Sequence, residues 1–88
     1  MFQAEEIYLT KAAQREFYEY NLTLTKVLEC LNHGVDSGEK RKEGITEKCI
    51  IHKKRILKIV VAESWDYSLK KIVWRVVHIG LVRGKLKI

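Results

Sequence analysis

The apolar residues of this chain change their spacing near residue 45, and this change limits the possible folds more than any other feature. Before it, the segment 24–33 carries leucines and a valine at the i, i+3, i+4, i+7 spacing of one helix face. After it, the runs 55–62 and 71–79 are rich in β-branched residues, which favour strands. A helical part followed by a strand part of similar length predicts the α+β class.

The first half of the chain predicts one short strand and two amphipathic helices. Residues 5–9 have the pattern of a short strand. Thr10 and Thr23 precede two helical patterns over 11–20 and 24–33, and a threonine oxygen accepts hydrogen bonds from the free N–H groups of a first helical turn. Because only two or three residues separate these helices, we expect them to form a helical hairpin.

The second half predicts an antiparallel sheet. A strand begins at Lys48, reverses at Lys53-Lys54, and is followed by the strands 55–62 and 71–79. The resulting order is β-α-α-β-β-β, with a two-helix hairpin packed on a small antiparallel sheet. Three glycines and many charges in 34–46 indicate a long loop, which we expect to be mobile.

Alternation along the two long strands divides their side chains between two faces. One face carries no formal charge, and we expect it to pack on the helices; it holds Leu57, Ile59, Val61, Ile72, Trp74, Val76 and His78. The other face mixes basic and apolar residues, namely Ile56, Lys58, Val60, Val73, Arg75 and Val77. A mixed face of this kind indicates a partner, which is a second subunit, another protein or a nucleic acid.

Length and composition exclude several classes of protein. The chain has 88 residues, 47% of them hydrophobic and 32% charged, which suits one small domain over residues 1–88. No run approaches the roughly 20 apolar residues of a membrane span. The first residues also lack the basic and apolar stretches of a signal peptide. We therefore expect a cytoplasmic protein without membrane contact, whose two cysteines are reduced.

Positive charge is concentrated in the second half of the chain. Residues 45–88 carry eleven basic and three acidic residues, whereas residues 1–44 carry six and eight. A basic segment of this size is typical of contact with RNA, DNA or an acidic protein, and an ordinary solvated surface gives the same pattern. The acidic first half offers Glu16 and Glu19 as a carboxylate pair, which we expect on an exposed helix face in contact with solvent.

Two Cys-x-x-His pairs raise the question of a metal. Cys30 with His33 and Cys49 with His52 have the outline of a four-ligand zinc site. Residues three apart share a face on a helix but point to opposite faces on a strand, and the second pair falls on a predicted strand. We therefore expect no metal and regard both cysteines as small packing residues. The chain contains no phosphate-binding glycine loop, and we expect no organic cofactor.

Two segments of the second half carry a resemblance. Arg55-Ile-Leu-Lys-Ile-Val-Val opens a central strand with an arginine, and Trp74-Arg-Val-Val-His-Ile-Gly-Leu-Val-Arg83 is an apolar strand that reaches a glycine and then basic residues. Together with the β-α-α-β-β-β order, they resemble the RelE/ParE-like toxin superfamily. The front segment, from Leu9-Thr-Lys-Ala-Ala-Gln-Arg15 to Thr23, is similar to a related family of small bacterial and archaeal proteins, with Ala12 and Tyr20 where that family has His and Arg.

The resemblance implies a ribosome-dependent mRNA endoribonuclease that needs no metal, or a degenerate relative of one. Arg55 and Arg83 would stabilise the charge of the reacting phosphate, and His78 would act as acid or base. The RNA backbone would be held by Lys53, Lys54, Lys58, Arg75 and Lys85. The partners would be RNA or the ribosome, or an acidic antitoxin-like protein.

A non-catalytic function of the same fold is the alternative. The last residues, Lys-Leu-Lys-Ile, lack the Tyr or His that nucleases of the superfamily often carry near the end of the chain. The protein would then bind another protein or a nucleic acid, and a homodimer is possible. Trp65 and Tyr67 would serve as aromatic anchors for such a partner, or would cover the edge of the sheet.

Overall fold

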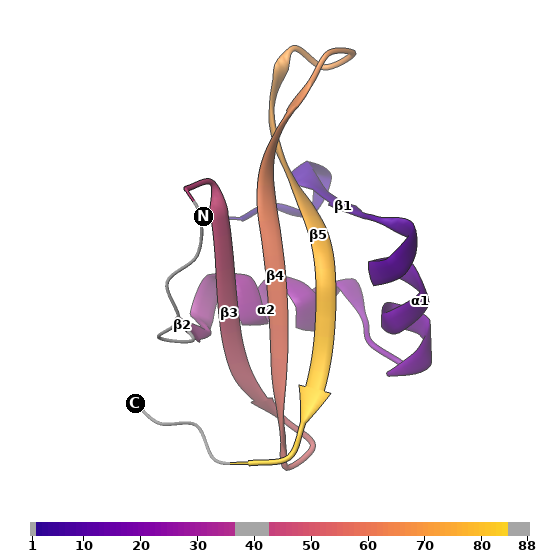
Figure 1. The fold of residues 1–88 in the computed structure, drawn as a ribbon, viewed down its shortest axis with the longest axis vertical. Coiled ribbons are helices and arrows are strands. Elements are labelled where there is room, and N and C mark those ends of the chain that lie inside the picture. Colours follow the sequence, from indigo (N-terminus) through magenta and orange to yellow (C-terminus); the bar gives the residue numbers. More distant parts are fainter. Residues whose placement is uncertain (1, 37–42, 85–88) are drawn as a thin grey trace.

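The computed structural model describes residues 2–36 and 43–84, and it confirms the α+β class (Figure 1). In chain order the elements are the 3-10 helix η1 (Ala4–Glu6), β1 (Ile7–Leu9), α1 (Lys11–Glu19), α2 (Leu24–His33), β2 (Val35–Asp36), β3 (Ile45–His52), β4 (Arg55–Asp66) and β5 (Lys71–Val82). Part of the predicted loop 34–46 is therefore strand, since β2 and the start of β3 lie within it. Its remainder, residues 37–42, lies outside the described residues.

Both helices begin at the predicted threonines. The Thr10 side chain accepts a hydrogen bond from the backbone N–H of Ala13 at 3.2 Å. The Thr23 side chain accepts one from the N–H of Lys26, also at 3.2 Å. Each threonine thus satisfies one of the N–H groups that a helix leaves free at its start.

The sheet differs from the prediction in one respect, because it is mixed and not wholly antiparallel. Its strand order is β1-β5-β4-β3-β2, and β1 pairs in parallel with β5, with Ile7 opposite Trp74. The other strand pairs are antiparallel. The alternation of residues within β1 does not show the direction in which it pairs. Its partner, β5, lies at the other end of the chain, and a parallel pair needs a long connection, which all the intervening elements provide here.

The two helices contact different strands, so they do not pack as the predicted hairpin. The first helix, α1, lies along β5 and β1, whereas α2 crosses behind β3 and β4 (Figure 1). Between them, Asn21 adopts a left-handed conformation (φ 52°) and Leu22 is buried. A connection that buries Leu22 spreads the helices over the sheet instead of folding one against the other.

The core lies between the helices and one face of the sheet. Its sheet side includes Leu57, Ile59, Val61 and Val76, all predicted for this face and all fully buried, with Trp74 packed against them. Its helix side includes Ala13, Val27, Cys30 and Leu31. Ile72, also predicted for this face, is 40% exposed because it lies beyond the part of β5 that the helices cover.

A β-bulge in β5 alters the facing of the residues that follow it. Val61 pairs with Val76 while Val60 pairs with His78, so the intervening Val77 is an extra residue in β5. The bulge moves Ile79 into the core and His78 to the opposite face. The prediction that His78 shares the face of Trp74 and Val76 is therefore wrong, because strict alternation fails at the bulge.

The hairpin of β4 and β5 extends beyond its neighbours. The pairing of β3 with β4 ends at Ala62, and the pairing of β1 with β5 begins at Trp74. Residues 63–73 therefore form a twisted two-stranded ribbon, here called the arm, which projects from one end of the molecule (Figure 1).

Candidate nucleic-acid interface

The turn between β3 and β4 presents two lysines at one end of the sheet. Lys53 and Lys54 both have positive φ values, 50° and 64°, as a two-residue type I′ turn requires. Such turns favour Asn-Gly, since a side chain with a full Cβ costs about 1–2 kcal/mol in this conformation. The predicted reversal is confirmed, and it places two charged residues where smaller residues would fit better.

Arg55 and Arg83 lie beside each other at the same end. Ile56 pairs with Val82, so the residues that continue these strands toward the end of the sheet, Arg55 and Arg83, are neighbours across β4 and β5. Both are exposed, as are the turn lysines. We call this group of four, Lys53, Lys54, Arg55 and Arg83, the basic end. Within the described part of the chain, no carboxylate forms an ion pair with any of them.

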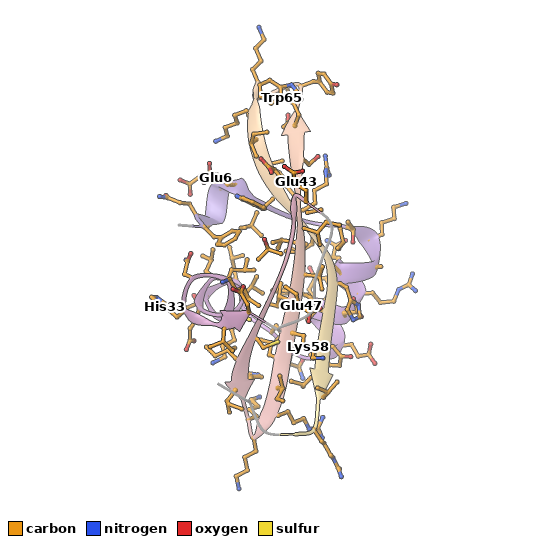
Figure 2. The ribbon with its side chains drawn as sticks, turned by 60° about the vertical axis from the view of Figure 1, so that its left-hand side comes forward. Glu6, His33, Glu43, Glu47, Lys58 and Trp65 are labelled. Carbon is orange, nitrogen blue, oxygen red and sulfur yellow. The ribbon has the colours of Figure 1, made fainter. Side chains whose placement is uncertain are left out.

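Two further predicted residues, Lys58 and Arg75, lie on the sheet face that neither helix covers, which we call the helix-free face. Lys58 lies opposite Gly80 on β5, next to the pair formed by Val60 and His78. Arg75, farther along β5, donates a hydrogen bond from Nε to Ser64 Oγ at 3.1 Å. The face is not uniformly basic, because the buried Glu47 of β3 lies on it near Lys58 (Figure 2). Lys85 lies outside the described residues.

His78 is engaged by a carboxylate from α1 and is remote from the two arginines. Glu16 Oε2 lies 3.1 Å from His78 Nδ1, and Glu16 Oε1 accepts the backbone N–H of Ile79 at 3.0 Å. The prediction that Glu16 is a solvated helix residue is therefore wrong. Its carboxylate accepts a backbone N–H of β5 that lies beyond the end of β1 and has no strand partner there. The strand partner of His78 lies five residues along β4 from Arg55, a separation of about 17 Å.

Another histidine, His52, lies closer to the arginines. It pairs directly with Arg55 across the β3–β4 turn. Desolvation lowers its pKa from 6.5, and the charges of Lys26 and Lys53 lower it further, so its imidazole is neutral at pH 7. Its Nε2 is buried without a hydrogen-bond partner in the described part of the chain. Sequence reasoning considered His52 only as a zinc ligand, although a two-residue turn at Lys53-Lys54 already implied that it faces Arg55.

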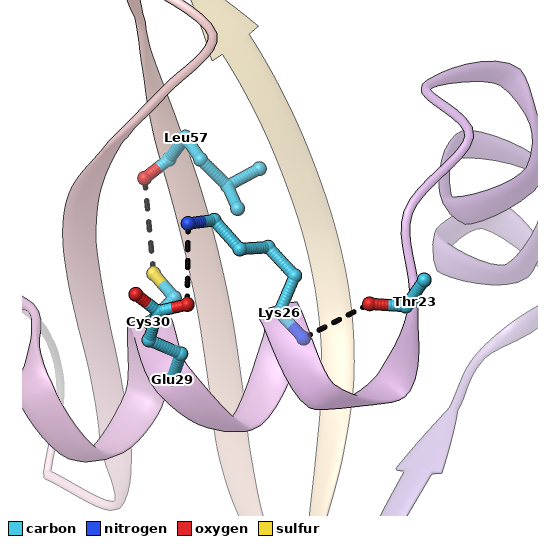
Figure 3. A network of polar contacts seen from close by, with 5 residues as sticks. All are labelled: Thr23, Lys26, Glu29, Cys30 and Leu57. Carbon is cyan, nitrogen blue, oxygen red and sulfur yellow. Dashed lines mark hydrogen bonds and ion pairs between the residues drawn. The ribbon is translucent and has the colours of Figure 1, made fainter.

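The four residues of the zinc pattern do not meet at one point. Cys30 is in the core, where its Sγ lies 3.4 Å from the carbonyl oxygen of Lys48. It also lies 3.8 Å from the carbonyl oxygen of Leu57 (Figure 3). Burial raises the pKa of this thiol to about 12, so it is not a thiolate. His33 is exposed at the end of α2. Among residues 2–36 and 43–84, no three His, Cys, Asp or Glu side chains are placed to hold a metal ion.

Apolar side chains gather on the arm at the other end of the sheet. Trp65, Leu69 and Ile72 are 40–48% exposed, and Tyr67 is 85% exposed. Trp65 and Tyr67 lie on the ribbon beyond the rest of the sheet, so the alternative prediction that they cover a sheet edge is wrong. Figure 2 shows Trp65 on the arm, well beyond Lys58.

Within the described residues, no helix is long and apolar enough to cross a membrane. Comparisons with protein-family models, with curated proteins and with solved structures find no match for this chain.

Proposed function

We propose that this protein binds RNA, with the basic end as the main contact for the phosphate backbone. The observation that carries the proposal is the convergence of four exposed cations, from a turn and two strands, without a neutralising carboxylate in the described residues. Arginine and lysine in such a group bind phosphates and release condensed counterions, which is the main source of affinity for a nucleic-acid backbone.

The turn geometry adds a second argument. Lys53 and Lys54 occupy backbone conformations that favour glycine and asparagine, so their side chains cost stability where they are. Residues held in unfavourable conformations cluster at functional sites. A binding role for the two ammonium groups accounts for lysine at both positions of the turn.

The helix-free face carries two further cations. Lys58 lies opposite Gly80 and Arg75 farther along β5, whereas strand alternation places Arg55 on the other face, with Leu57. The resemblance to the RelE/ParE-like superfamily agrees with an RNA target.

RNA cleavage is a second candidate function, and one observation favours it: the neutral imidazole of His52 lies across the turn from Arg55. In such a reaction His52 would take the proton of the 2′-hydroxyl as its oxygen attacks phosphorus, and Arg55 and Arg83 would stabilise the negative charge on the nonbridging oxygens. The P–O5′ bond would break, and the released 5′-oxygen would take a proton from water. His78, bonded to Glu16 at a distance from both arginines, is less suited to this role than predicted. The Nε2 atom of His52 is buried, so it is poorly placed to take a proton from a substrate hydroxyl. RNA binding is therefore better supported than RNA cleavage.

Binding of a labelled oligouridine of about 12 nucleotides, measured by fluorescence anisotropy over a salt series, tests the proposal. The double variant Arg55→Gln/Arg83→Gln removes two charges from the basic end. The matched control, Lys11→Gln/Arg15→Gln, removes two exposed charges from α1. We expect the first variant to reduce the slope of log K against log salt by about 1.4, and the control to leave it unchanged. Equal effects of the two variants would refute the assignment of the basic end.

The same proteins in a cell-free translation reaction test cleavage. If His52 acts as the base, RNA cutting disappears in His52→Gln while oligouridine binding persists. Intact RNA in the presence of wild-type protein and ribosomes would remove the nuclease candidate and leave the binding proposal unaffected.

A further inference from the structure

The arm carries Tyr67, the most exposed aromatic side chain of the described chain, together with Trp65, on a segment that the basic end does not use. Tyr67 is 85% exposed and Trp65 is 47% exposed. We propose that the arm stacks the unpaired bases of single-stranded RNA on these two rings. This inference rests on the proposed RNA binding and specifies its substrate class, because stacking needs bases that are free of a duplex.

The arm is built to hold its aromatic groups in place. Asp66 Oδ1 accepts the backbone N–H groups of Ser68 and Leu69, at 2.9 and 3.0 Å. The carbonyl oxygen of Asp66 accepts the N–H of Lys70 at 2.7 Å, and Lys70 completes the turn with a φ of 54°. Tyr67 therefore projects from an ordered turn, which reduces the entropy lost when a ligand binds.

The charges of the arm favour an anionic ligand. Lys70, Lys71 and Arg75 surround the ring-bearing segment, against the carboxylates of Glu63 and Asp66. The hydrogen bonds from Leu69 and Ser68 lower the pKa of the Asp66 carboxyl, so this carboxylate stays ionised and only partly offsets the three cations. An excess of cations next to exposed rings is the combination used to bind single-stranded nucleic acids, with ring stacking on the bases and cations on the backbone.

The position of the arm makes it a separate contact. Trp65 lies ten residues along β4 from Arg55, a distance of about 33 Å along an extended strand. Between the two lie Lys58 and Arg75, on the helix-free face. The basic end and the arm therefore lie at opposite ends of β4, so the two contacts can be removed independently.

The test compares aromatic with aliphatic replacements. Trp65→Leu and Tyr67→Leu keep an apolar side chain and remove the ring, whereas Trp65→Phe and Tyr67→Phe keep a ring. We expect each leucine variant to weaken binding of the oligouridine roughly 5- to 100-fold, with most of the affinity retained in the phenylalanine variants. The salt slope is expected to stay at the wild-type value, and binding of an RNA duplex of equal length is expected to be unchanged. Trp65 fluorescence, measured in Trp74→Phe protein, is expected to be quenched by oligouridine.

The outcomes separate this inference from the proposed function. If Arg55→Gln/Arg83→Gln weakens binding but the leucine variants do not, stacking on the arm is refuted and RNA binding stands. If the leucine variants weaken binding and the arginine variant does not, the basic end is refuted and the arm stands. Loss of duplex binding in the leucine variants would refute stacking. A changed sedimentation coefficient in these variants with unchanged RNA affinity would also refute it, and would identify the arm as a contact between copies of the protein. Absence of any oligouridine binding by wild-type protein would refute both.

Discussion

Replacing Lys53-Lys54 with Asn-Gly is expected to stabilise the protein and to weaken its binding of RNA. Both lysines have left-handed backbone conformations, at φ 50° and 64°. Each costs about 1 kcal/mol relative to glycine, and asparagine at the first position retains part of this cost, so the exchange is worth about 1–2 kcal/mol in unfolding free energy. For a domain of this size, such a gain raises Tm by roughly 5–15 °C.

The same exchange removes two of the four charges of the basic end. If both lysines contact phosphates, the salt slope of oligouridine binding falls by about 1.4. The matched control is Lys53→Gln/Lys54→Gln, which removes the same charges and keeps two side chains that are unfavourable in the turn. Thermal unfolding by circular dichroism and the anisotropy titration measure the two effects separately. Equal Tm values for the two double variants would refute the conformational argument, and wild-type salt slopes in both would refute the binding role of the turn.

Three further predictions concern single groups. Glu16→Ala leaves the N–H of Ile79 without its acceptor, and we expect urea unfolding to show a decrease of about 1–3 kcal/mol in the free energy of unfolding. A decrease below about 0.5 kcal/mol would mean that water replaces the carboxylate. Because folding lowers the pKa of His52, the unfolded state takes up the proton first, so unfolding free energy is expected to fall as the pH drops below about 6.5. The variant His52→Gln is expected to lose less stability over that range, and parallel pH profiles would contradict the assignment. The thiol of Cys30, with a pKa of about 12 and no exposure, is expected to resist iodoacetamide at pH 8 until the protein unfolds; rapid alkylation of Cys30 in native protein, located by mass spectrometry, would contradict its burial.

The secondary structure was largely predictable, because its signals are local. Threonine caps, helical spacing and β-branched runs all act within a few residues, and the starts of α1 and α2 agree with the structure. The assignment of Leu57, Ile59 and Val61 to the buried face was also correct, because alternation holds along the whole of β4.

The features that sequence reasoning missed depend on partners distant in the chain. An inserted residue at Val77 changes the face of His78, and no local pattern marks a bulge. The parallel pairing of β1 and the contact of Glu16 with Ile79 depend on where the first helix meets the last strand. Arg55 and Arg83 were predicted as site residues from a resemblance. That they are neighbours follows from the register of β4 and β5, and alternation alone does not determine this register when a strand contains a bulge.

The parallel pairing of β1 with β5 has a consequence for the order of folding. The β3–β4–β5 meander joins neighbours in sequence through short turns, so it can form from local contacts. In contrast, Ile7 and Leu9 meet their partners only after Trp74–Val76 has been synthesised, and closing this loop spans almost the whole described chain. On the ribosome, Ile7 and the apolar side of α1 therefore stay unpartnered until β5 emerges. We therefore expect the attachment of β1 to β5 to come late in folding, and a slow or interrupted chain to be exposed to aggregation until it occurs.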